Sequence, residues 1–527
     1  MPPTSRHTAS RKDESALATN ETGYLLMSKA IKSHTLSKGQ RHKVTIESLA
    51  PGGEGVAKSL GPPVFINRVV PGDVVEIELF DVRKDFAKAK VTSIISPSQH
   101  RAEPPCPLFK VCGGCQWQHM TYEYQLIAKE DIVKQALKHI GKLDPTIVKP
   151  IIGADESLHY RNKAQFPVKH PHGSDRILAG YYRQDSHELV NIKHCPVQPE
   201  SMDHVLELIK EICEEHGITA YDEKSHKGLL RHINIRFSFE NRKSLITLVL
   251  NASATSADDF TNLKCYDSVR GAAEALTDAI PDVVGVAINL NNERGNKILG
   301  DLTFPIAGAD RIQEVLRTSR EDFPEALRTG LRFDLSSSSF FQVNTQQAVK
   351  LLEEVYLAVA DMHKDNLTIV DAYAGVGAIS LWLASAANNV IAIEDHPAAV
   401  LDGRHNAQLN GIHNVEFNEG RVEDVLLEMR NDGVTVDVVV VDPPRKGMSA
   451  EAIEALLWAE PERIVYVSCN PATLARDLKA LEQGLMKSAQ DGDKEEFVGY
   501  KTKQVQPVDL FPQTFHVESV SVLERLR

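Results

Sequence analysis

The sequence has no long hydrophobic run, and no segment approaches the ~20 consecutive apolar residues that a membrane-spanning helix needs. Residues 1–34 also lack the apolar core of a secretory signal. Aromatic residues make up only 6% of the 527 residues, while 42% are hydrophobic, which is typical of a soluble globular protein of about three domains. These absences predict a cytoplasmic location and no membrane partner, and nothing in the composition indicates an obligate protein partner.

Cysteine is scarce as well, and the few cysteines do not indicate a disulfide framework. Their number, seven, is odd, and no export signal accompanies them. They stand at positions 106, 112, 115, 195, 213, 265 and 469. Clustering toward one end of such a chain indicates metal or catalytic chemistry.

Basic residues are in deficit, because the formal net charge is -13, and this argues against a polyanionic partner for the chain as a whole. The deficit is uneven, however. Residues 1–200 hold 27 lysines and arginines against 21 aspartates and glutamates, whereas the remainder holds 32 against 51. Phosphate contacts depend on local clusters of lysine and arginine, so the first 200 residues are the better candidate for a nucleic-acid surface.

Changes in pattern divide the chain into four segments. Residues 1–35 are polar and aperiodic and predict a disordered tail. Residues 36–97 contain short alternating runs between Gly/Pro turns, which predict a small β-barrel, with the basic run RKDFAKAK (83–90) as a candidate phosphate-tracking edge. Residues 98–335 predict an α+β domain. Strands and helices alternate over 336–527, which predicts a doubly wound α/β sheet with ligands at the carboxyl ends of its strands.

A glycine-rich turn, DAYAGVGA (371–378), follows one predicted strand of the last segment and opens a helix. Asp371 ends that strand with a carboxylate, and Gly375 and Gly377 allow the backbone to approach a ligand closely. The next strand ends at Glu394, where a carboxylate can accept hydrogen bonds from ribose hydroxyls. Together they predict a mononucleotide half-site.

Two further strands end in residues that can do chemistry, Asp442 and Cys469. Cys469 precedes an Asn-Pro turn at the start of a helix, whose amino terminus can favour a thiolate, so it is a candidate covalent nucleophile. Glu518 lies just inside the start of the last strand, where its carboxylate could lie near the substrate.

The amino-terminal cysteines have the spacing of a metal site. PPCPLFKVCGGCQWQH (104–119) contains C-x5-C-x2-C, and Cys195 follows about eighty residues later. Four thiolates suit zinc or an iron-sulfur cluster, and three clustered ligands with one distant ligand favour the cluster. Two basic stretches, YRNK (160–163) and KGLLRHINIR (227–236), are candidate RNA contacts, although solvent-facing or core ion-pair roles fit them nearly as well.

With these residues in place, the chain resembles the RNA uracil-5-methyltransferases that use S-adenosylmethionine. Within that family it resembles the ribosomal-RNA branch that carries an amino-terminal TRAM domain and a 4Fe-4S cluster. The resemblance covers roughly residues 36–527. It rests on the cysteine set and on five motifs in order: SSFFQVN (338–344), DAYAGVG (371–377), DPPRKG (442–447), SCNPATLARD (468–477) and HVES (516–519).

The resemblance implies a Rossmann-like class I methyltransferase domain, preceded by an OB-like TRAM domain and a central α+β domain with the cluster. It implies methylation of carbon 5 of a specific uridine in 23S ribosomal RNA through a covalent Cys-uracil intermediate. Cys469 is then the nucleophile and Glu518 the general base. The other implied site residues are Gln342, Tyr373, Glu394 and Asp442 at S-adenosylmethionine, and Cys106, Cys112, Cys115 and Cys195 at the 4Fe-4S cluster.

Two positions depart from what the family often shows. Ala374 stands where cysteine is common, and Ala378 stands where asparagine or threonine is frequent, which could remove a side-chain contact to the cofactor. Transfer RNA, methylated at a T-loop uridine, is an alternative substrate. A non-catalytic RNA-binding protein is an alternative of another class, although Cys469, Glu518 and Asp442 together argue against it. An iron-sulfur electron carrier leaves the α/β half unexplained.

Overall fold

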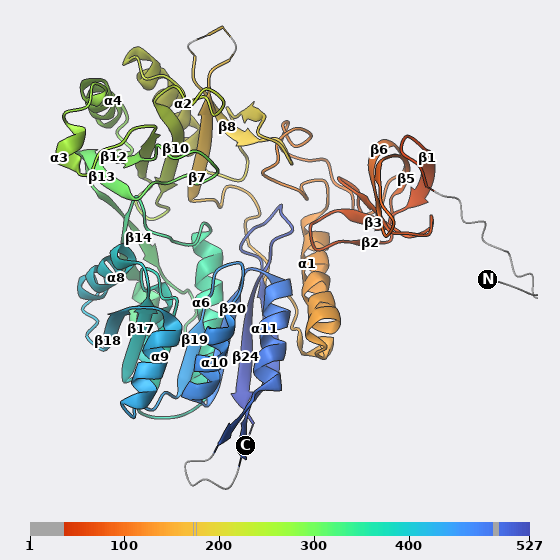
Figure 1. The fold of residues 1–527 in the computed structure, drawn as a ribbon, viewed down its shortest axis with the longest axis vertical. Helices are drawn as coiled ribbons and strands as arrows, with labels where there is room; N and C mark the ends of the chain where they lie inside the picture. The colour runs from red at the N-terminus through yellow and green to blue at the C-terminus, as the bar shows by residue number, and fades with distance from the viewer. Residues whose placement is uncertain (1–35, 172, 175, 489–494, 527) are drawn as a thin grey trace, which may run out of the picture.

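The computed structural model describes residues 36–171, 173–174, 176–488 and 495–526. The predicted tail, residues 1–35, lies outside the described residues. The mixed α/β class predicted from the sequence is confirmed, and the described chain forms three larger sheets and two short hairpin sheets (Figure 1). Across the described helices, none combines the length and the apolar content needed to cross a bilayer.

The amino-terminal sheet curls around a core of its own, which valine, isoleucine, leucine and alanine side chains fill. Its order is β1-β5-β6-β4-β3-β2, and residues alternate between core and solvent as expected for a strand with one buried face. The strands are β1 (Arg41–Thr45), β2 (Ser48–Leu49), β3 (Gly55–Ala57), β4 (Val64–Ile66), β5 (Val74–Val82) and β6 (Ala87–Ser96).

The central sheet has seven strands in the order β13-β12-β11-β10-β7-β8-β9. Helices α2 and α4 cover one of its faces through a shared apolar core. Its strands are β7 (Lys163–Lys169), β8 (Leu178–Tyr182), β9 (Leu189–Asn191), β10 (Leu230–Phe237), β11 (Ser244–Leu250), β12 (Val283–Leu290) and β13 (Leu302–Gly308). The helices of this region are α2 (Glu200–Glu215), α3 (Ala257–Phe260) and α4 (Tyr266–Ala279).

The carboxyl-terminal sheet has seven strands in the order β18-β17-β16-β19-β20-β24-β23. Its first five members are parallel, while β24 runs antiparallel to both of its neighbours. The strand order reverses at β16, which is the switch point where open α/β sheets bind ligands. The strands are β16 (Thr368–Ala372), β17 (Asn389–Glu394), β18 (Val415–Glu419), β19 (Val438–Val441), β20 (Arg463–Ser468), β23 (Tyr500–Val508) and β24 (Glu518–Arg525).

Helices cover both faces of this sheet, as a doubly wound fold requires (Figure 1). They are α6 (Thr345–Ala360), α7 (Ala378–Leu383), α8 (Pro397–Leu409), α9 (Val422–Asn431), α10 (Ala450–Ala459) and α11 (Pro471–Gln483). The short hairpin β21 (Leu485–Ser488) and β22 (Glu495–Val498) lies near the carboxyl terminus.

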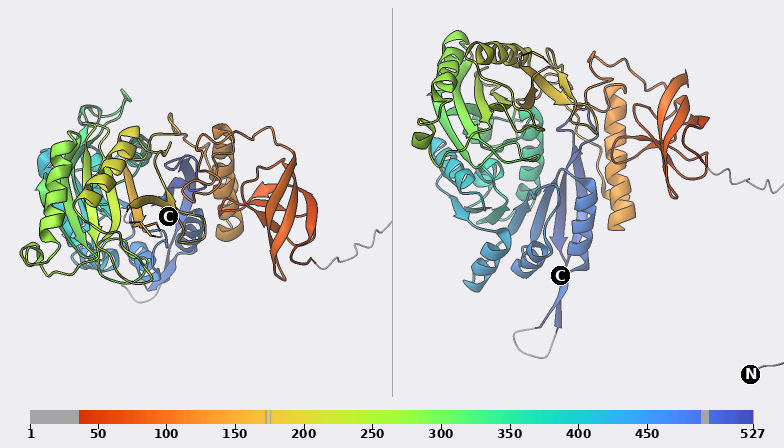
Figure 2. Two further views of the ribbon diagram at one scale, coloured as in Figure 1. Left: turned by 90° about the horizontal axis from the view of Figure 1, so that it is seen from above. Right: turned by 45° about the horizontal axis from the view of Figure 1, so that its top comes forward.

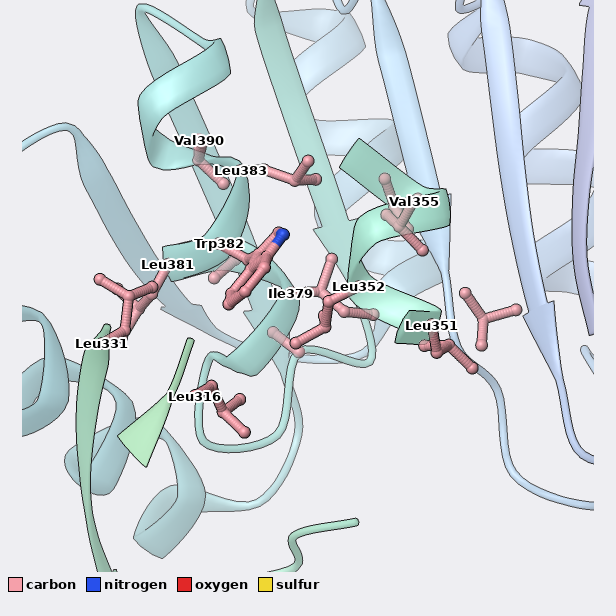
Figure 3. Packing of buried hydrophobic residues seen from close by; sticks show 14 of the residues in the cluster. Leu316, Leu331, Leu351, Leu352, Val355, Ile379, Leu381, Trp382, Leu383 and Val390 are labelled. Carbon is pink, nitrogen blue, oxygen red and sulfur yellow. The ribbon is translucent and has the colours of Figure 1, made fainter. Parts of the chain in front are cut away.

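The hairpin β14 (Arg311–Leu316) and β15 (Leu331–Ser336), with α5 (Glu325–Thr329) between its strands, packs on the carboxyl-terminal sheet. Figure 3 shows Leu316 and Leu331 of this hairpin beside Leu381 and Trp382 of α7. Since α7 begins directly after the glycine-rich turn, this packing holds the turn against the sheet. The core therefore draws on residues from both sides of the predicted boundary at 335.

Helix α1 (Tyr122–Ala136) lies between the amino-terminal sheet and α11 (Figures 1 and 2). Val133 of α1 and Leu137, which follows it, share a core with Leu474 and Leu478 of α11. This helix belongs to the predicted central segment in sequence but packs on the carboxyl-terminal sheet. It therefore brings the amino-terminal part of the chain to the ligand-binding edge of that sheet.

Candidate active site

Four of the predicted site residues stand where neighbouring parallel strands end. Tyr373 follows β16, Glu394 ends β17, Asp442 follows β19 and Cys469 follows β20. These strands are adjacent in the order β17-β16-β19-β20. The structure therefore brings the four residues to one edge of the sheet.

Glu518 reaches the same edge because its strand runs the other way. It is the first residue of β24, which pairs antiparallel with β20 so that Ser468 lies opposite Ser519. An antiparallel strand begins where its partner ends, so Glu518 begins beside Cys469. The side chain of Glu518 is buried, with the residue only 3% exposed.

The two carboxyl groups nearest Cys469 are Asp442 and Glu518, and both hold their protons unusually strongly. Burial and the charge of Asp442 raise the pKa of Glu518 well above its ordinary value, and burial raises the pKa of Asp442 to about 7. Neither carboxyl group makes a hydrogen bond to another residue that the structure describes. Unpartnered acids with perturbed pKa values, here the buried Glu518 and the half-buried Asp442, are typical of ligand and catalytic sites.

The thiol of Cys469 is held in its protonated form by the same surroundings. Burial, followed by the charges of Glu518 and Asp442, raises its pKa to about 11, and Arg445 opposes the change. Cys469 lies one residue before Asn470, the N-cap of α11. The expectation that the helix terminus favours the thiolate is therefore not met here, because burial and two carboxyl groups outweigh it.

Arg445 is a site residue that sequence reasoning did not single out. Its side chain is exposed and lowers the pKa of both Cys469 and Glu518, and this side chain forms no ion pair or hydrogen bond with another described residue. A lone arginine three residues after the strand-end Asp442 was the available signal. Its positive charge is free to meet an anionic substrate.

A cavity of about 430 Å³ opens beside Cys469. One wall comes from α1, through Ile132 and Gln135, and another comes from Phe515 and His516, just before β24. Burial lowers the pKa of His516 to about 4, so its ring is neutral at pH 7. The walls are largely apolar side chains, with Arg445 and Asn470 among the polar ones. No local pattern in the sequence identifies the α1 wall, because α1 is over 300 residues away from Cys469 in the chain.

The glycine-rich turn and Glu394 form a cradle at the end of β16 and β17. Glu394 Oε2 accepts a hydrogen bond from the Gly375 amide at 2.8 Å, and its Oε1 accepts one from the His396 amide at 2.9 Å. Gly375 has φ +56, and a Cβ atom there would meet only open space. The side-chain amide of Gln342 makes no hydrogen bond to another described residue. A glycine-lined space beside an ordered carboxylate fits the nucleoside part of S-adenosylmethionine.

Asp371 does not face this cradle as a free carboxylate. It is fully buried and accepts a hydrogen bond from the Ser380 hydroxyl of α7. Burial raises its pKa to about 7. Asp371 therefore ties α7 to β16 and supports the turn from behind.

The four predicted cluster cysteines lie close enough for their charges to interact. Cys106 raises the pKa of each of the other three thiols, and burial is the main cause that raises those of Cys115 and Cys195 to about 12. Cys265 lies elsewhere, at the start of α4. Within the part of the chain that the structure describes, however, no group of three or more potential ligands is arranged to hold a metal ion. The thiols thus lie near one another, but the predicted metal site is not shown.

The two basic stretches proposed as RNA contacts serve largely inside the protein. Asn162 donates to the Gln342 carbonyl at 3.0 Å. Arg236 is buried and donates to the Ser339 carbonyl, and buried Arg231 donates to the Asn291 carbonyl. Arg231, at a bulge near the start of β10, is bound within the central domain, whereas Arg236 reaches the segment after β15, so neither charge is presented to a partner.

We predict that Arg445→Gln slows alkylation of Cys469, because losing the cation raises the pKa of the thiol further and lowers the thiolate fraction. The expected change is about tenfold for each unit of pKa. It is measured as the iodoacetamide rate at the Cys469 peptide by mass spectrometry. Lys446→Gln, which removes the adjacent exposed charge, is the control. Equal rates for Arg445→Gln and the unmodified protein contradict the prediction.

Known proteins resemble this chain over most of its length. The family model described as tRNA (Uracil-5-)-methyltransferase matches residues 308–526, and the TRAM domain model matches residues 36–92. An uncharacterized RNA methyltransferase of Gloeobacter violaceus is 41% identical over 501 residues, which cover 95% of this chain and 100% of the relative. One of Halalkalibacterium halodurans is 39% identical over 489 residues, which cover 93% and 98%.

A solved structure shares the fold. The tRNA (uracil-54, C5)-methyltransferase of Pyrococcus abyssi, in complex with S-adenosyl-L-homocysteine, has a TM-score of 0.66 and 24% sequence identity. The match covers 91% of this chain and 99% of that one. With identities near 40% over nearly the whole length of its relatives, the chain belongs to the S-adenosylmethionine-dependent RNA uracil-5-methyltransferase family and is an RNA methyltransferase.

Proposed function

We propose that the protein methylates carbon 5 of a specific uridine in 23S ribosomal RNA through a covalent bond between Cys469 and the uracil ring. The observation that carries this proposal is that Cys469, Asp442 and Glu518 meet at one edge of the sheet, beside a cavity. The thiol is the proposed nucleophile, the two acids are the proposed base and orienting group, and the nearby arginine favours the thiolate.

Carbon 5 of uracil is a poor nucleophile, so the ring must first be activated. The thiolate of Cys469 forms a bond to carbon 6, and the electrons of the 5,6 double bond move toward the carbonyl oxygen at carbon 4. The resulting enolate is nucleophilic at carbon 5. Arg445 acts in favour of this step because its charge stabilises the thiolate that begins it.

Glu518 completes the reaction by taking the proton from carbon 5. The electrons of that carbon–hydrogen bond restore the 5,6 double bond, and the thiolate of Cys469 leaves carbon 6. A pKa well above the ordinary value makes the Glu518 carboxylate a stronger base than an exposed glutamate. The product is 5-methyluridine.

S-adenosylmethionine supplies the methyl group when it is bound. Glu394 and the turn at Gly375 are placed to bind its nucleoside part, and Gln342, Tyr373 and Asp442 are the other residues proposed to line its site. Asp442 lies between this cradle and Cys469, because β19 lies between β16 and β20. It can therefore orient both the cofactor and the uracil ring.

The RNA surface is proposed to begin at the amino-terminal sheet. Along β6, Ala87 and Ala89 face the core while Lys88 and Lys90 face solvent, with Lys90 paired to Glu78 at 3.0 Å, so the lysines lie on one side of the strand only. The target uridine has to leave its stack to expose carbon 6 to Cys469, so we infer that it is flipped out of a loop. The cavity beside Cys469, of about 430 Å³, has room for the flipped uracil base.

We also propose that Cys106, Cys112, Cys115 and Cys195 bind a 4Fe-4S cluster. Their supporting features are a four-thiol donor set and thiols close enough to raise one another's pKa values, since a bound cation relieves such repulsion. The proposed role is to organise the surrounding segment.

Transfer RNA is the second candidate substrate. The matching family model is described as a tRNA methyltransferase, and the solved neighbour of Pyrococcus abyssi is named as one too. The resemblance to the ribosomal-RNA branch, in which a TRAM domain occurs together with four cluster cysteines, is what supports ribosomal RNA. The two substrates are distinguished by mapping the methylated uridine.

We predict that protein purified anaerobically transfers label from S-adenosylmethionine to 5-methyluridine in total RNA that lacks the modification. Nucleoside digestion and mass spectrometry detect the label, and its position separates ribosomal from transfer RNA. Cys469→Ser is expected to abolish transfer, because the ring is no longer activated. Cys265→Ser, a distant cysteine change, is expected to leave it intact.

The same assay tests the base. Glu518→Gln is expected to form a protein–RNA adduct that survives denaturing electrophoresis, because carbon 5 keeps its proton and Cys469 cannot leave. Absence of label from every nucleoside, with cofactor binding demonstrated, contradicts the proposed reaction. Label in another nucleoside contradicts the choice of uracil.

We predict that Glu394→Ala weakens S-adenosylhomocysteine binding about 10- to 100-fold, since hydrogen bonds to a charged group contribute about 1.5–3 kcal/mol. The change also frees the Gly375 amide. Isothermal titration calorimetry measures the affinity. Glu419→Ala, at the exposed end of the neighbouring strand β18, is the matched control. An unchanged affinity in Glu394→Ala sinks this assignment.

We predict that anaerobically reconstituted protein contains iron and sulfide and has the broad visible absorption of a cluster. Cys112→Ser is expected to lose both, while Cys265→Ser keeps them. Metal analysis and the absorption spectrum are the measurements, independent of activity. If the protein as purified contains zinc and no iron, and binds no iron on reconstitution, the four cysteines form a zinc site and the proposal of a 4Fe-4S cluster is wrong.

A further inference from the structure

The connection between β23 and β24, residues 509–517, contains no helix or strand, yet its backbone is held from outside. Each of its first five carbonyl oxygens accepts a hydrogen bond from another part of the chain. The donors are Gln347 to Asp509 (2.9 Å), Asn344 to Leu510 (3.3 Å), Lys129 to Phe511 (3.0 Å), Tyr160 to Pro512 (2.9 Å) and the Gln116 and Trp117 amides to Gln513 (3.1 and 3.0 Å). Tertiary donors thus replace the ladder that a strand would supply.

A buried ion pair lies at the start of this connection. Lys129 Nζ of α1 contacts Asp509 Oδ1 at 2.5 Å, and both side chains are 0% exposed. The Tyr122 hydroxyl donates to the other oxygen of Asp509 at 2.9 Å. Removing two charges from water is costly, so such a pair contributes little net stability compared with apolar packing. It does impose one geometry between α1 and the connection.

The connection leads directly into the catalytic edge. Val508, the residue before Asp509, lies opposite Glu518 in the ladder between β23 and β24. At its other end, Phe515 and His516 form a wall of the cavity beside Cys469. The strand ladders fix where β24 begins, and the shape of residues 509–517 influences the orientation of the Glu518 carboxyl group and the position of this wall.

Cys469 is held by different contacts. Ser468 Oγ accepts a hydrogen bond from the Asn470 amide at 3.2 Å, and the Asn470 side chain donates to the Arg445 carbonyl at 3.0 Å. Neither contact involves residues 509–517 or α1. A disturbance of the connection can therefore shift the Glu518 side chain while these two contacts on either side of Cys469 remain.

We propose that Lys129 and Asp509 are positioning residues for the step in which Glu518 removes the carbon 5 proton. This inference rests on the proposed covalent mechanism. The pair holds the connection against α1 in a single arrangement, and this arrangement orients the Glu518 side chain at the start of β24. Loss of the pair slows release of Cys469 from the methylated base while adduct formation continues.

The test is Lys129→Met, which keeps much of the length of the side chain and removes its charge. We expect the covalent protein–RNA adduct to accumulate as in Glu518→Gln, with release about 10- to 100-fold slower than in the unmodified protein. Denaturing electrophoresis measures the adduct, and 5-methyluridine measures release. Lys134→Met, on the same helix but in a half-exposed pair with Glu130, is the control and should release normally.

The double variant Lys129→Met/Asp509→Asn separates positioning from stability. The double variant leaves no unpaired buried charge. If Lys129 and Asp509 serve stability alone, the double variant should release Cys469 at the rate of the unmodified protein. If they position Glu518, release should stay slow. If Lys129→Met does not fold, Tyr122→Phe removes the hydrogen bond to Asp509, together with the one from the Ala154 amide, without leaving a charge, and a smaller rise in adduct is expected.

Normal release in the folded Lys129→Met or in the double variant overturns the inference, as does a parallel loss of adduct and product with S-adenosylhomocysteine binding intact. The Glu518→Gln reference separates this failure from that of the proposed function. If Glu518→Gln forms no adduct on RNA that the unmodified protein methylates, the covalent mechanism itself is wrong.

Discussion

The antiparallel pairing of β24 with β20 is the constraint on which the candidate active site depends. In a fully parallel sheet, Glu518 would begin its strand at the edge opposite Cys469. Because β24 runs against β20, with Ser468 opposite Ser519, the start of one strand meets the end of the other. The nucleophile and the base candidates, about fifty residues apart in the chain, thereby become neighbours without a long loop to carry either of them.

This meeting creates an electrostatic situation that a soluble protein ordinarily avoids. Asp442 and Glu518 are acids with raised pKa values, without hydrogen-bond partners among the described residues, and they hold Cys469 as a thiol. Arg445 is the cation that opposes them. Positive charge or hydrogen-bond donors added beside such groups lower their pKa values and favour the thiolate.

The amino-terminal part of the chain takes a direct part in shaping the site. Gln116 and Trp117 directly follow Cys115, and their amides donate to the Gln513 carbonyl. Trp117 Nε1 donates to the carbonyl of Gly53, in the turn between β2 and β3, at 3.1 Å. A single short segment thus contacts the TRAM domain, the cysteine group and the connection before Glu518. This arrangement links the TRAM domain, the cysteine group and the sheet that carries the candidate active site through direct contacts.

The sequence by itself determined the alternation of strands and helices, the glycine-rich turn and the reactive residues at strand ends, because these depend on local patterns of hydrophobicity and on residue type. Only the tertiary structure decided the raised pKa of Cys469, the influence of Arg445, the inward role of Asp371 and the burial of Arg231 and Arg236. Desolvation and charge depend on every neighbour in space. The pair of Lys129 with Asp509 spans 380 positions, and no local pattern encodes such a contact.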